Sequence, residues 1–317
     1  MGGLRSLTLL AISAVALAAC DVPVEPVPVP PERPAAPVKP APPEPSGPSE
    51  KSQRLAAYYT KVETQLVAQG LLRTDGGGPD TQFSRRMLLE NFERIAFFDE
   101  YARGGGLTAS FGTQSRLKRW EMPVRMRVEF GRNVSDAQKA TDRAEVTRYA
   151  ARLARITGHP ITMSDSDPNY HVLYMSEDDS ADLPGRIKAI VPNINQNALN
   201  IFNDLPRSIH CLVIAFSSEA GGHEYAKAIA VIRTEHPSLL RKSCVHEELA
   251  QGLGLANDSP KARPSIFNDD DEFALLTSHD ELLLKMLYDR RLRAGMSWEQ
   301  AKPIAETIVD ELLGGPS

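Results

Sequence analysis

The stretch CVHEELAQGLGLANDS, residues 244–259, carries the most informative pattern of the chain. Leu249 and Leu253 are four residues apart, so they share the core-facing side of a predicted helix. Glu247 and Gln251 are also four apart and share a different face. Gly254 is expected to end the helix, so that the chain turns back beneath this polar face. We therefore expect a helix with one side in the core and the other at a cleft beside a sheet.

The polar residues of this helix invite comparison with the zinc-binding pattern H-E-x-x-H. Its two histidines must lie at positions i and i+4 to project from one face. His246 fails this test, because Ala250 stands four residues later. A frame moved by one residue fits better: Glu247 and Gln251 take the ligand positions, and Glu248 takes that of the general base.

The residues after the helix extend this frame. Gly254 takes the position of the turn glycine, and Asn257 or Asp258 that of a third ligand. The stretch thus resembles the metzincin-type motif H-E-x-x-H-x-x-G-x-x-H with both helix histidines replaced. Residues 265–268 resemble the Met-turn region, with Phe267 in place of methionine. Residues 276–288 resemble the closing helix of matrixin-like zincins.

The chain also closely resembles domain-of-unknown-function family 2927, whose members are often described as proteobacterial lipoproteins and have no established activity. The resemblance covers residues 119–296. Its matching segments are Arg119-Trp120-Glu121 with Pro123-Val124, the Cys211 strand, residues 247–251, Leu253-Gly254-Leu255 with Asn257-Asp258, residues 265–269, and residues 280–284. The resemblance implies a zincin-like fold and implies no activity.

The ligand chemistry leaves three alternatives open. Catalytic zinc prefers three imidazole, thiolate or carboxylate ligands, whereas Gln251 and Asn257 offer neutral carbonyl oxygens that suit harder cations. In the first alternative no cofactor is present, and Glu247 and Gln251 form a buried hydrogen-bond network that replaces the metal. In the second, a divalent zinc or calcium ion is held without proteolysis by Glu247, Gln251, Asn257 and Asp258. The third is metallohydrolysis with Glu248 as the general base.

The hydrophobic pattern upstream predicts a sheet and a second helix. Residues 123–130 alternate apolar and polar side chains, which predicts a strand, and residues 135–157 repeat apolar residues on one helical face. Further strands are expected at 170–175, at 211–216, which is apolar throughout and predicts a buried strand, and at 225–233. Ser243 is the expected N-cap of the motif helix. The series predicts an α+β fold, with a mixed sheet backed by helices.

The N-terminal third divides into segments of different character. Residues 1–19 are expected to be a signal peptide, 20–50 a lipidated cysteine with a disordered proline-rich linker, and 51–118 a helical segment. Helical spacing of apolar residues supports two helices in this last segment, at 55–66 and 83–98. Gly104-Gly105-Gly106 predicts a flexible turn rather than a phosphate loop. Residues 119–317 form the expected zincin-like domain.

The first twenty residues have the pattern of a bacterial lipoprotein signal. The apolar run at 7–19 is too short to span a bilayer. Leu17-Ala18-Ala19-Cys20 matches a lipobox, in which Cys20 receives diacylglycerol and the preceding peptide is removed. The alternative is an ordinary secretory signal cut after Ala19. Asp21 resembles an inner-membrane retention signal, so we expect a lipid-anchored, periplasm-facing protein of the cell envelope, with the inner membrane favoured.

Two cysteines remain after Cys20 is assigned to lipid. In an exported protein, Cys211 and Cys244 predict a disulfide, although two separate buried thiols are the alternative. The net charge of −5 and the lack of a basic stripe argue against nucleic-acid binding. Asp269-Asp270-Asp271-Glu272 predicts a solvated acidic loop rather than a calcium site, because the EF-hand pattern is missing.

Two classes of function follow from these observations. The first is a membrane-anchored pseudo-peptidase, which uses a degenerate zincin-like domain to bind a peptide or an envelope protein, or as a scaffold. The second is a metallopeptidase with unusual oxygen ligands from Glu, Gln and Asp side chains. Tightly bound stoichiometric metal would favour the second.

Overall fold

A computed structural model of the protein describes residues 47–100, 112–203, 205–219, 221–268 and 270–314. The expected signal peptide, Cys20, most of the proline-rich linker and Gly104-Gly105-Gly106 lie outside these residues. Among the residues that are described, no helix has both the length and the apolar character needed to cross a membrane.

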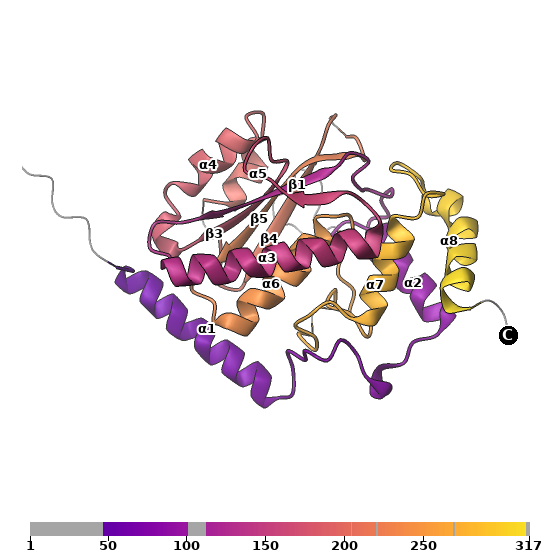
Figure 1. Ribbon diagram of the computed structural model, residues 1–317, viewed down its shortest axis with the longest axis horizontal. Helices are drawn as coiled ribbons and strands as arrows, with labels where there is room; N and C mark the ends of the chain where they lie inside the picture. The colour runs from indigo at the N-terminus through magenta and orange to yellow at the C-terminus, as the bar shows by residue number, and fades with distance from the viewer. Residues whose placement is uncertain (1–46, 101–111, 204, 220, 269, 315–317) are drawn as a thin grey trace, which may run out of the picture. The chain divides into compact units, whose positions relative to one another are not determined.

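The described chain alternates between helices and strands (Figure 1). The helices are α1 (Glu50–Ala68), α2 (Arg85–Ala96), α3 (Asp136–Thr157), α4 (Leu183–Ile190), α5 (Gln196–Ile201), α6 (Ser238–Gln251), α7 (Ser278–Leu287) and α8 (Trp298–Leu313), with short 3-10 turns η1 (Pro79–Thr81) and η2 (Glu177–Asp179). The strands are β1 (Val124–Phe130), β2 (Ile161–Met163), β3 (Tyr170–Met175), β4 (Cys211–Ser217) and β5 (Tyr225–Arg233).

The five strands form one mixed sheet in the order β2-β1-β3-β5-β4. Strands β2, β1, β3 and β5 pair in parallel, whereas β4 pairs antiparallel with β5 and lies at the edge. The expected α+β class, with a mixed sheet backed by helices, is confirmed. The antiparallel edge strand proves to be the element that shapes the candidate site.

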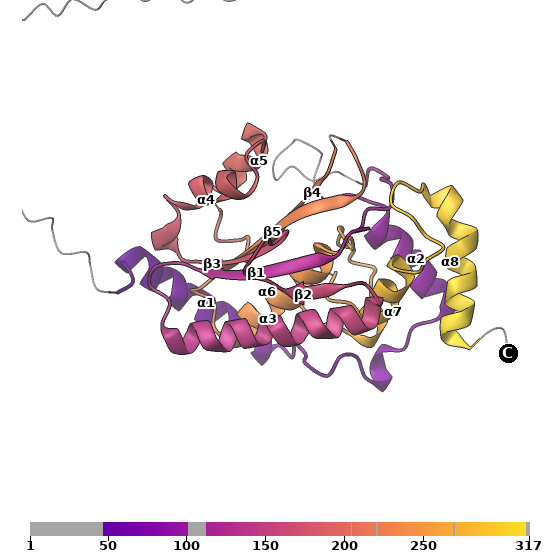
Figure 2. The same cartoon turned by 45° about the horizontal axis from the view of Figure 1, so that its top comes forward.

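Helices cover both faces of the sheet. Figure 2 shows α3 and α6 on one face and α4 and α5 on the other. Two separate apolar cores correspond to these layers. The core beneath α3 and α6 includes Tyr170, Val172 and Ala230, while the core beneath α4 and α5 includes Leu173 and Val231. Because consecutive side chains of a strand point to opposite faces, β3 and β5 are apolar at nearly every position.

Local sequence signals explain where the main helices begin and end. The Ser135 hydroxyl accepts a hydrogen bond from the N–H of Gln138 (3.2 Å) and caps α3, which ends at Gly158 in the left-handed conformation. Helix α6 has no side-chain cap of its own; instead Glu63 of α1 accepts the N–H of Leu240 (2.8 Å). A carboxylate from a distant helix thus satisfies the positive end of α6.

Two expectations about this region are wrong. Ser243 is not the N-cap of the motif helix, because the helix already begins at Ser238, after Pro237, and Ser243 lies inside it. The strand at 211–216 is not buried throughout: within β4 only Leu212 is fully buried, because an edge strand has a neighbour on one side only. The short strand β2 was not expected from the sequence.

The remaining helices complete the core at the end of the sheet near the motif. Helix α2 packs against α7 and α8, and its Leu88 and Phe92 belong to the same apolar core as Trp120 of the segment before β1. In the segment that follows α6, Leu255 and Phe267 are fully buried and belong to the same core. This packing fixes the position of the residues after the motif helix.

Candidate functional site

The motif helix α6 places its polar residues on separate sides. Leu249 and Leu253 are fully buried in the core, as the spacing predicts. His246 points away from β4: its Nδ1 accepts the N–H of Leu276 (3.0 Å), and its ring stacks on Tyr149 with centroids 4.0 Å apart. Burial lowers the pKa of His246, so the ring stays neutral in the core. His246 therefore has a structural role.

Glu248 is the most unusual ionisable group of the helix. Its residue is only 4% exposed, and its carboxyl group accepts a hydrogen bond from the backbone N–H of Val213 in β4. The second oxygen, Oε2, has no hydrogen-bond partner among the residues described. Burial raises the pKa of Glu248 well above its usual value, and the nearby carboxylates of Glu100 and Asp258 raise it further. The site thus favours a protonated, neutral Glu248.

The other motif positions bind to each other or to the backbone. The side-chain amide of Gln251 donates to Asp258 Oδ1 (3.1 Å), and that of Asn257 donates to the carbonyl oxygen of Arg94 (2.8 Å). Gly254 has φ +127°, and a Cβ at this position would overlap the carbonyl oxygen of Lys118. The expectation that Gly254 ends the helix is wrong, because α6 already ends at Gln251. Gly254 is instead required in the turn that follows, where the backbone conformation and the nearby Lys118 carbonyl exclude a side chain.

These residues do not fit the zinc centre that the motif resemblance implies. At the expected ligand positions the chain has Glu247, Gln251 and either Asn257 or Asp258. Gln251 and Asn257 are neutral amides already used as hydrogen-bond donors, and Asp258 accepts the bond from Gln251. Such a set lacks the imidazole ligands that hold catalytic zinc. Among the residues described, the one grouping of potential His, Cys, Asp or Glu ligands contains Glu247, Glu248 and Cys211, and so does not include Asp258.

A disulfide joins the edge strand to the motif helix. Cys211, the first residue of β4, is bonded to Cys244 of α6, with Cα atoms 5.8 Å apart. The predicted pairing is confirmed. The bond holds the first residue of β4 against α6, at a point one helical turn before Glu247 and Glu248.

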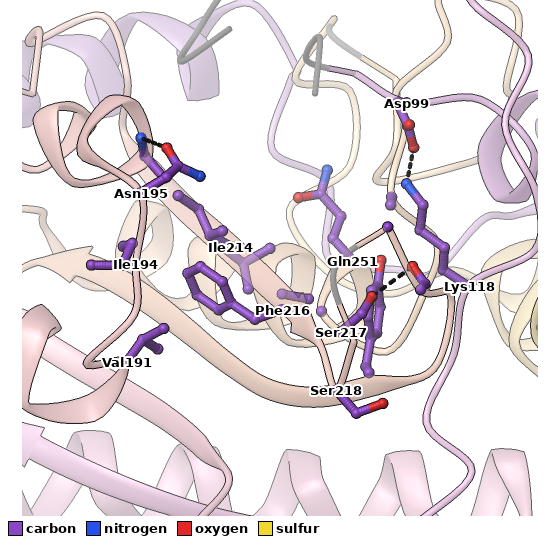
Figure 3. A pocket seen from close by; sticks show the side chains of 18 of the residues that line it. Asp99, Lys118, Val191, Ile194, Asn195, Ile214, Phe216, Ser217, Ser218 and Gln251 are labelled. Atoms are coloured by element: carbon purple, nitrogen blue, oxygen red, sulfur yellow. Dashed lines mark hydrogen bonds and ion pairs between the residues drawn. The ribbon is translucent and has the colours of Figure 1, made fainter. Parts of the chain in front are cut away.

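An open cavity of about 840 Å³ lies along β4, and we call it the β4 groove (Figure 3). Ile214 and Phe216 of β4 line its apolar end together with Val191 and Ile194, which lie between α4 and α5. The opposite end is polar and is lined by Asp99, Glu100, Lys118, Ser217 and Gln251. The groove therefore combines an open strand edge, an apolar pocket and a charged end near the motif helix.

The region of the chain that contains the site matches the model of a protein family. A family model described as a protein of unknown function (DUF2927) matches residues 85–307. The chain belongs to this family. No curated protein and no solved structure matches the chain. The resemblance to this family expected from the sequence is confirmed, and the DUF2927 match extends toward the N-terminus to include α2.

The DUF2927 domain also contains site residues that the sequence did not indicate. Asp99 and Lys118 form an ion pair at the polar end of the β4 groove, and Glu100 lies beside them. These residues come from the segment before β1, more than a hundred positions from α6 in the sequence. They carry no motif, and only the packing of this segment against the turn after α6 brings them to the groove.

Two other acidic features of the domain are structural. Glu272 of the acidic run pairs with Arg73 (3.0 Å) and Arg263 (2.6 Å), while Asp269 lies outside the described residues. Asp280 accepts the N–H groups of Thr277 (2.9 Å) and Ile266 (3.1 Å), and thereby caps α7 and anchors the preceding loop. Both carboxylates are satisfied by protein groups.

Proposed function

We propose that this protein is a lipid-anchored component of the cell envelope whose domain is a degenerate zincin-like module that binds extended peptides without cleaving them. The observation that carries the proposal is the position of β4. It lies at the edge of the sheet and forms a wall of the β4 groove. Among the described residues, no strand pairs with its side away from β5.

The backbone of β4 offers a template for a peptide strand. The backbone N–H of Val213 donates to Glu248, so this N–H points away from β5. Pairing alternates along an antiparallel strand, so Ala215 faces the same open side. An extended peptide could pair with this edge through main-chain hydrogen bonds. Its side chains would enter the apolar pocket formed by Ile214 and Phe216.

The motif residues support binding without hydrolysis. A zincin-type peptidase needs a metal-activated water beside its general base. Here the expected ligand positions offer no imidazole, and the amides of Gln251 and Asn257 already donate hydrogen bonds. Without a bound zinc ion, Glu248 has no activated water to deprotonate. The polar end of the groove, where Ser217 and Gln251 lie, is suited to holding a ligand by hydrogen bonds.

The anchor and the partner class rest on the sequence. Leu17-Ala18-Ala19-Cys20 supports lipidation, and the proline-rich residues 21–50 support a spacer between the membrane and the domain. A module held in this way would meet peptides or unfolded segments of other envelope proteins. Asp21 supports retention at the inner membrane.

Binding can be tested with a library of short, extended, N-acetylated peptides and the purified chain carrying Cys20→Ser. Selected peptides should contain an aliphatic or aromatic residue, because one side chain would enter the apolar pocket. Ala215→Pro should abolish binding, since it removes an N–H from the open edge of β4. Ile214→Asp should weaken it by at least about tenfold, because it places a charge in an apolar pocket.

Val67→Asp is the matched control, because Val67 is an exposed apolar residue on α1 outside the groove. It should bind like the unmodified chain. Equal binding by the Ala215→Pro variant, or no selected peptide at millimolar concentration, would count against the proposal. Cleavage of library peptides that a chelator and Glu248→Gln both stop would instead establish the alternative, a metallopeptidase with oxygen ligands.

A further inference from the structure

Three side chains with metal-binding atoms converge where β4 meets α6. The Sγ atom of Cys211 and one carboxylate oxygen each of Glu247 and Glu248 all lie within 4.8 Å of one another. Two carboxylates in consecutive positions of a helix ordinarily diverge by about 100°. Here both reach the same sulfur atom, and the disulfide to Cys244 keeps that sulfur in place.

The buried carboxylate of Glu248 is a second observation in favour of a ligand at this cluster. Glu248 is 96% buried, since only 4% of the residue is exposed, and its Oε2 has no hydrogen-bond partner among the described residues. Buried polar atoms without partners are costly, and they commonly mark a site for an ion or another ligand. A cation bound by Cys211, Glu247 and Glu248 would give the buried Glu248 carboxylate a second partner besides the N–H of Val213.

The second half of the disulfide has a different environment. The Sγ atom of Cys244 lies 3.7 Å from Nδ1 of His236, a buried imidazole whose Nε2 has no partner in the part of the chain that the structure describes. Cleavage of the disulfide would leave the Cys244 thiol beside this imidazole. The Cys211 thiol would remain at the half-buried start of β4, facing the two carboxylates. The two cysteines are therefore not equivalent once reduced.

We propose that reduction of the Cys211–Cys244 disulfide converts this cluster into a binding site for a borderline divalent cation, with zinc as the best match. A dithiol supplies the two electrons and two protons: the S–S bond breaks, two thiols form, and the reductant becomes a disulfide. Zinc then binds the Cys211 sulfur and the Glu247 and Glu248 oxygens. Its binding releases the Cys211 thiol proton and any proton on Glu248.

The geometry and the ligand types fit this ion. Tetrahedral zinc with one sulfur and two oxygens places the ligand atoms about 3.3–3.5 Å apart, so the side chains must approach by at most about 1.5 Å. Thiolate favours zinc over calcium, which prefers oxygen ligands alone. The oxidised sulfur is a much weaker ligand than a thiolate, so the disulfide keeps the site inactive. The inference does not depend on peptide binding in the β4 groove.

The test measures zinc binding by the full chain carrying Cys20→Ser, in which Cys211 and Cys244 are the only thiols. Titration against a chromophoric zinc indicator should give one site after reduction with a phosphine and none in the oxidised protein. Cys244→Ser should bind zinc without any reductant, whereas Cys211→Ser should not. Cobalt added to the Cys244→Ser variant should show a thiolate-to-metal charge-transfer band.

Carboxylate variants test the other two ligands. Glu247→Gln and Glu248→Gln, each in the Cys244→Ser background, should weaken zinc binding by at least about tenfold, because even the loss of a group behind a ligand has that effect. Glu299→Gln on the exposed surface of α8 is the matched control and should bind normally. Circular dichroism reports whether each protein is folded.

Three results would overturn the proposal. The first is equal zinc binding by the Cys211→Ser and Cys244→Ser variants, and the second is equal binding by the oxidised and reduced proteins. The third is the lack of zinc binding by a reduced chain, whether that chain stays folded or unfolds on reduction. A reduced chain that binds no zinc, folded or unfolded, would show that reduction does not create a zinc site at Cys211, Glu247 and Glu248.

Discussion

The side-chain amide of Gln251 donates to the carboxylate of Asp258 across the turn that follows α6, over 3.1 Å. Two of the expected ligand residues are therefore hydrogen-bonded to each other. We predict that a chelator changes the melting temperature of the oxidised chain by less than about 1 °C, because a metal bound to the folded state would otherwise stabilise it. A fall of several degrees, reversed by added zinc or calcium, would show that these residues hold a cation instead.

The burial of Glu248 predicts a pH-dependent stability. Its pKa is raised in the folded state, so the folded protein binds its proton more tightly than the unfolded chain does. This contribution is fully present at low pH and is lost as the pH rises above the unfolded pKa of about 4.3 and through the raised folded pKa. Glu248→Gln should therefore be more stable than the unmodified chain at pH 8, by about 1 kcal/mol or more.

The same comparison at pH 4 should show little difference, because both side chains are then neutral. Urea denaturation of the oxidised proteins at the two pH values measures the effect. Glu299→Gln, at an exposed position, should show no gain at pH 8. A Glu248→Gln variant that is less stable than the unmodified chain at pH 8 would mean that the carboxylate is ionised and paired.

Loss of the disulfide should destabilise the domain without unfolding it. The bridge spans a sequence separation of 33 residues, for which chain entropy predicts a contribution of about 3.5 kcal/mol. Domains of this kind are commonly stable by about 5–15 kcal/mol, so a folded state should survive. The double variant Cys211→Ser/Cys244→Ser, compared with the oxidised chain in urea, tests this. A change below about 1 kcal/mol would indicate that the bridge constrains the unfolded chain weakly.

Gly254 should be among the least replaceable residues of the domain. Alanine at this position would combine φ +127° with an overlap between its Cβ and the carbonyl oxygen of Lys118. We expect Gly254→Ala to cost about 3 kcal/mol or more. Gly185 in α4 is the control, since a Cβ there meets no atom within 4 Å, and Gly185→Ala should stabilise by about 0.5 kcal/mol. Equal thermal stability of the two variants would contradict this account of the turn.

Lipidation at Cys20 predicts a change in cell fractionation. Cys20→Ser should move the protein from the membrane pellet into the soluble fraction after a high-salt wash, because at least two acyl chains are needed for a stable anchor. The unmodified chain should remain in the pellet and incorporate labelled fatty acid. Retention of the Cys20→Ser variant in the pellet would show that another interaction holds the protein at the membrane.

The periodicity of the sequence was sufficient for the long elements of the fold. The alternation of Val124, Met126 and Val128 correctly predicted strand β1. The buried face of α3 was also predicted correctly, because its 22 residues contain several repeats of the apolar pattern. The three residues of β2 are too few to show a period. The start of α6 was misplaced because its cap is Glu63, which lies far away in the sequence.

The candidate site was less accessible to sequence reasoning. The spacing correctly predicted that Leu249 of α6 and Leu253 of the following turn are buried, and two cysteines in a chain expected to be exported predicted the disulfide. The apolar run of β4 did not reveal that it lies at an edge, because Ile214 and Phe216 pack in part against the second core and also line the groove. The approach of Cys211 to Glu247 and Glu248 depends on tertiary packing alone.

The covalent link between Cys211 and Cys244 also has a kinetic consequence. Edge strands are often the first part of a sheet to open, which exposes their amides to exchange with solvent and to proteases. Here β4 is covalently bonded to a helix whose residues Val245 and Leu249 lie in the main core. Detachment of the first residues of β4 therefore requires α6 to move as well. Because core helices open rarely, the start of this edge strand should exchange its amide hydrogens as slowly as α6 does. The sheet thus keeps one open edge that resists fraying, as the proposed pairing of a peptide with β4 requires.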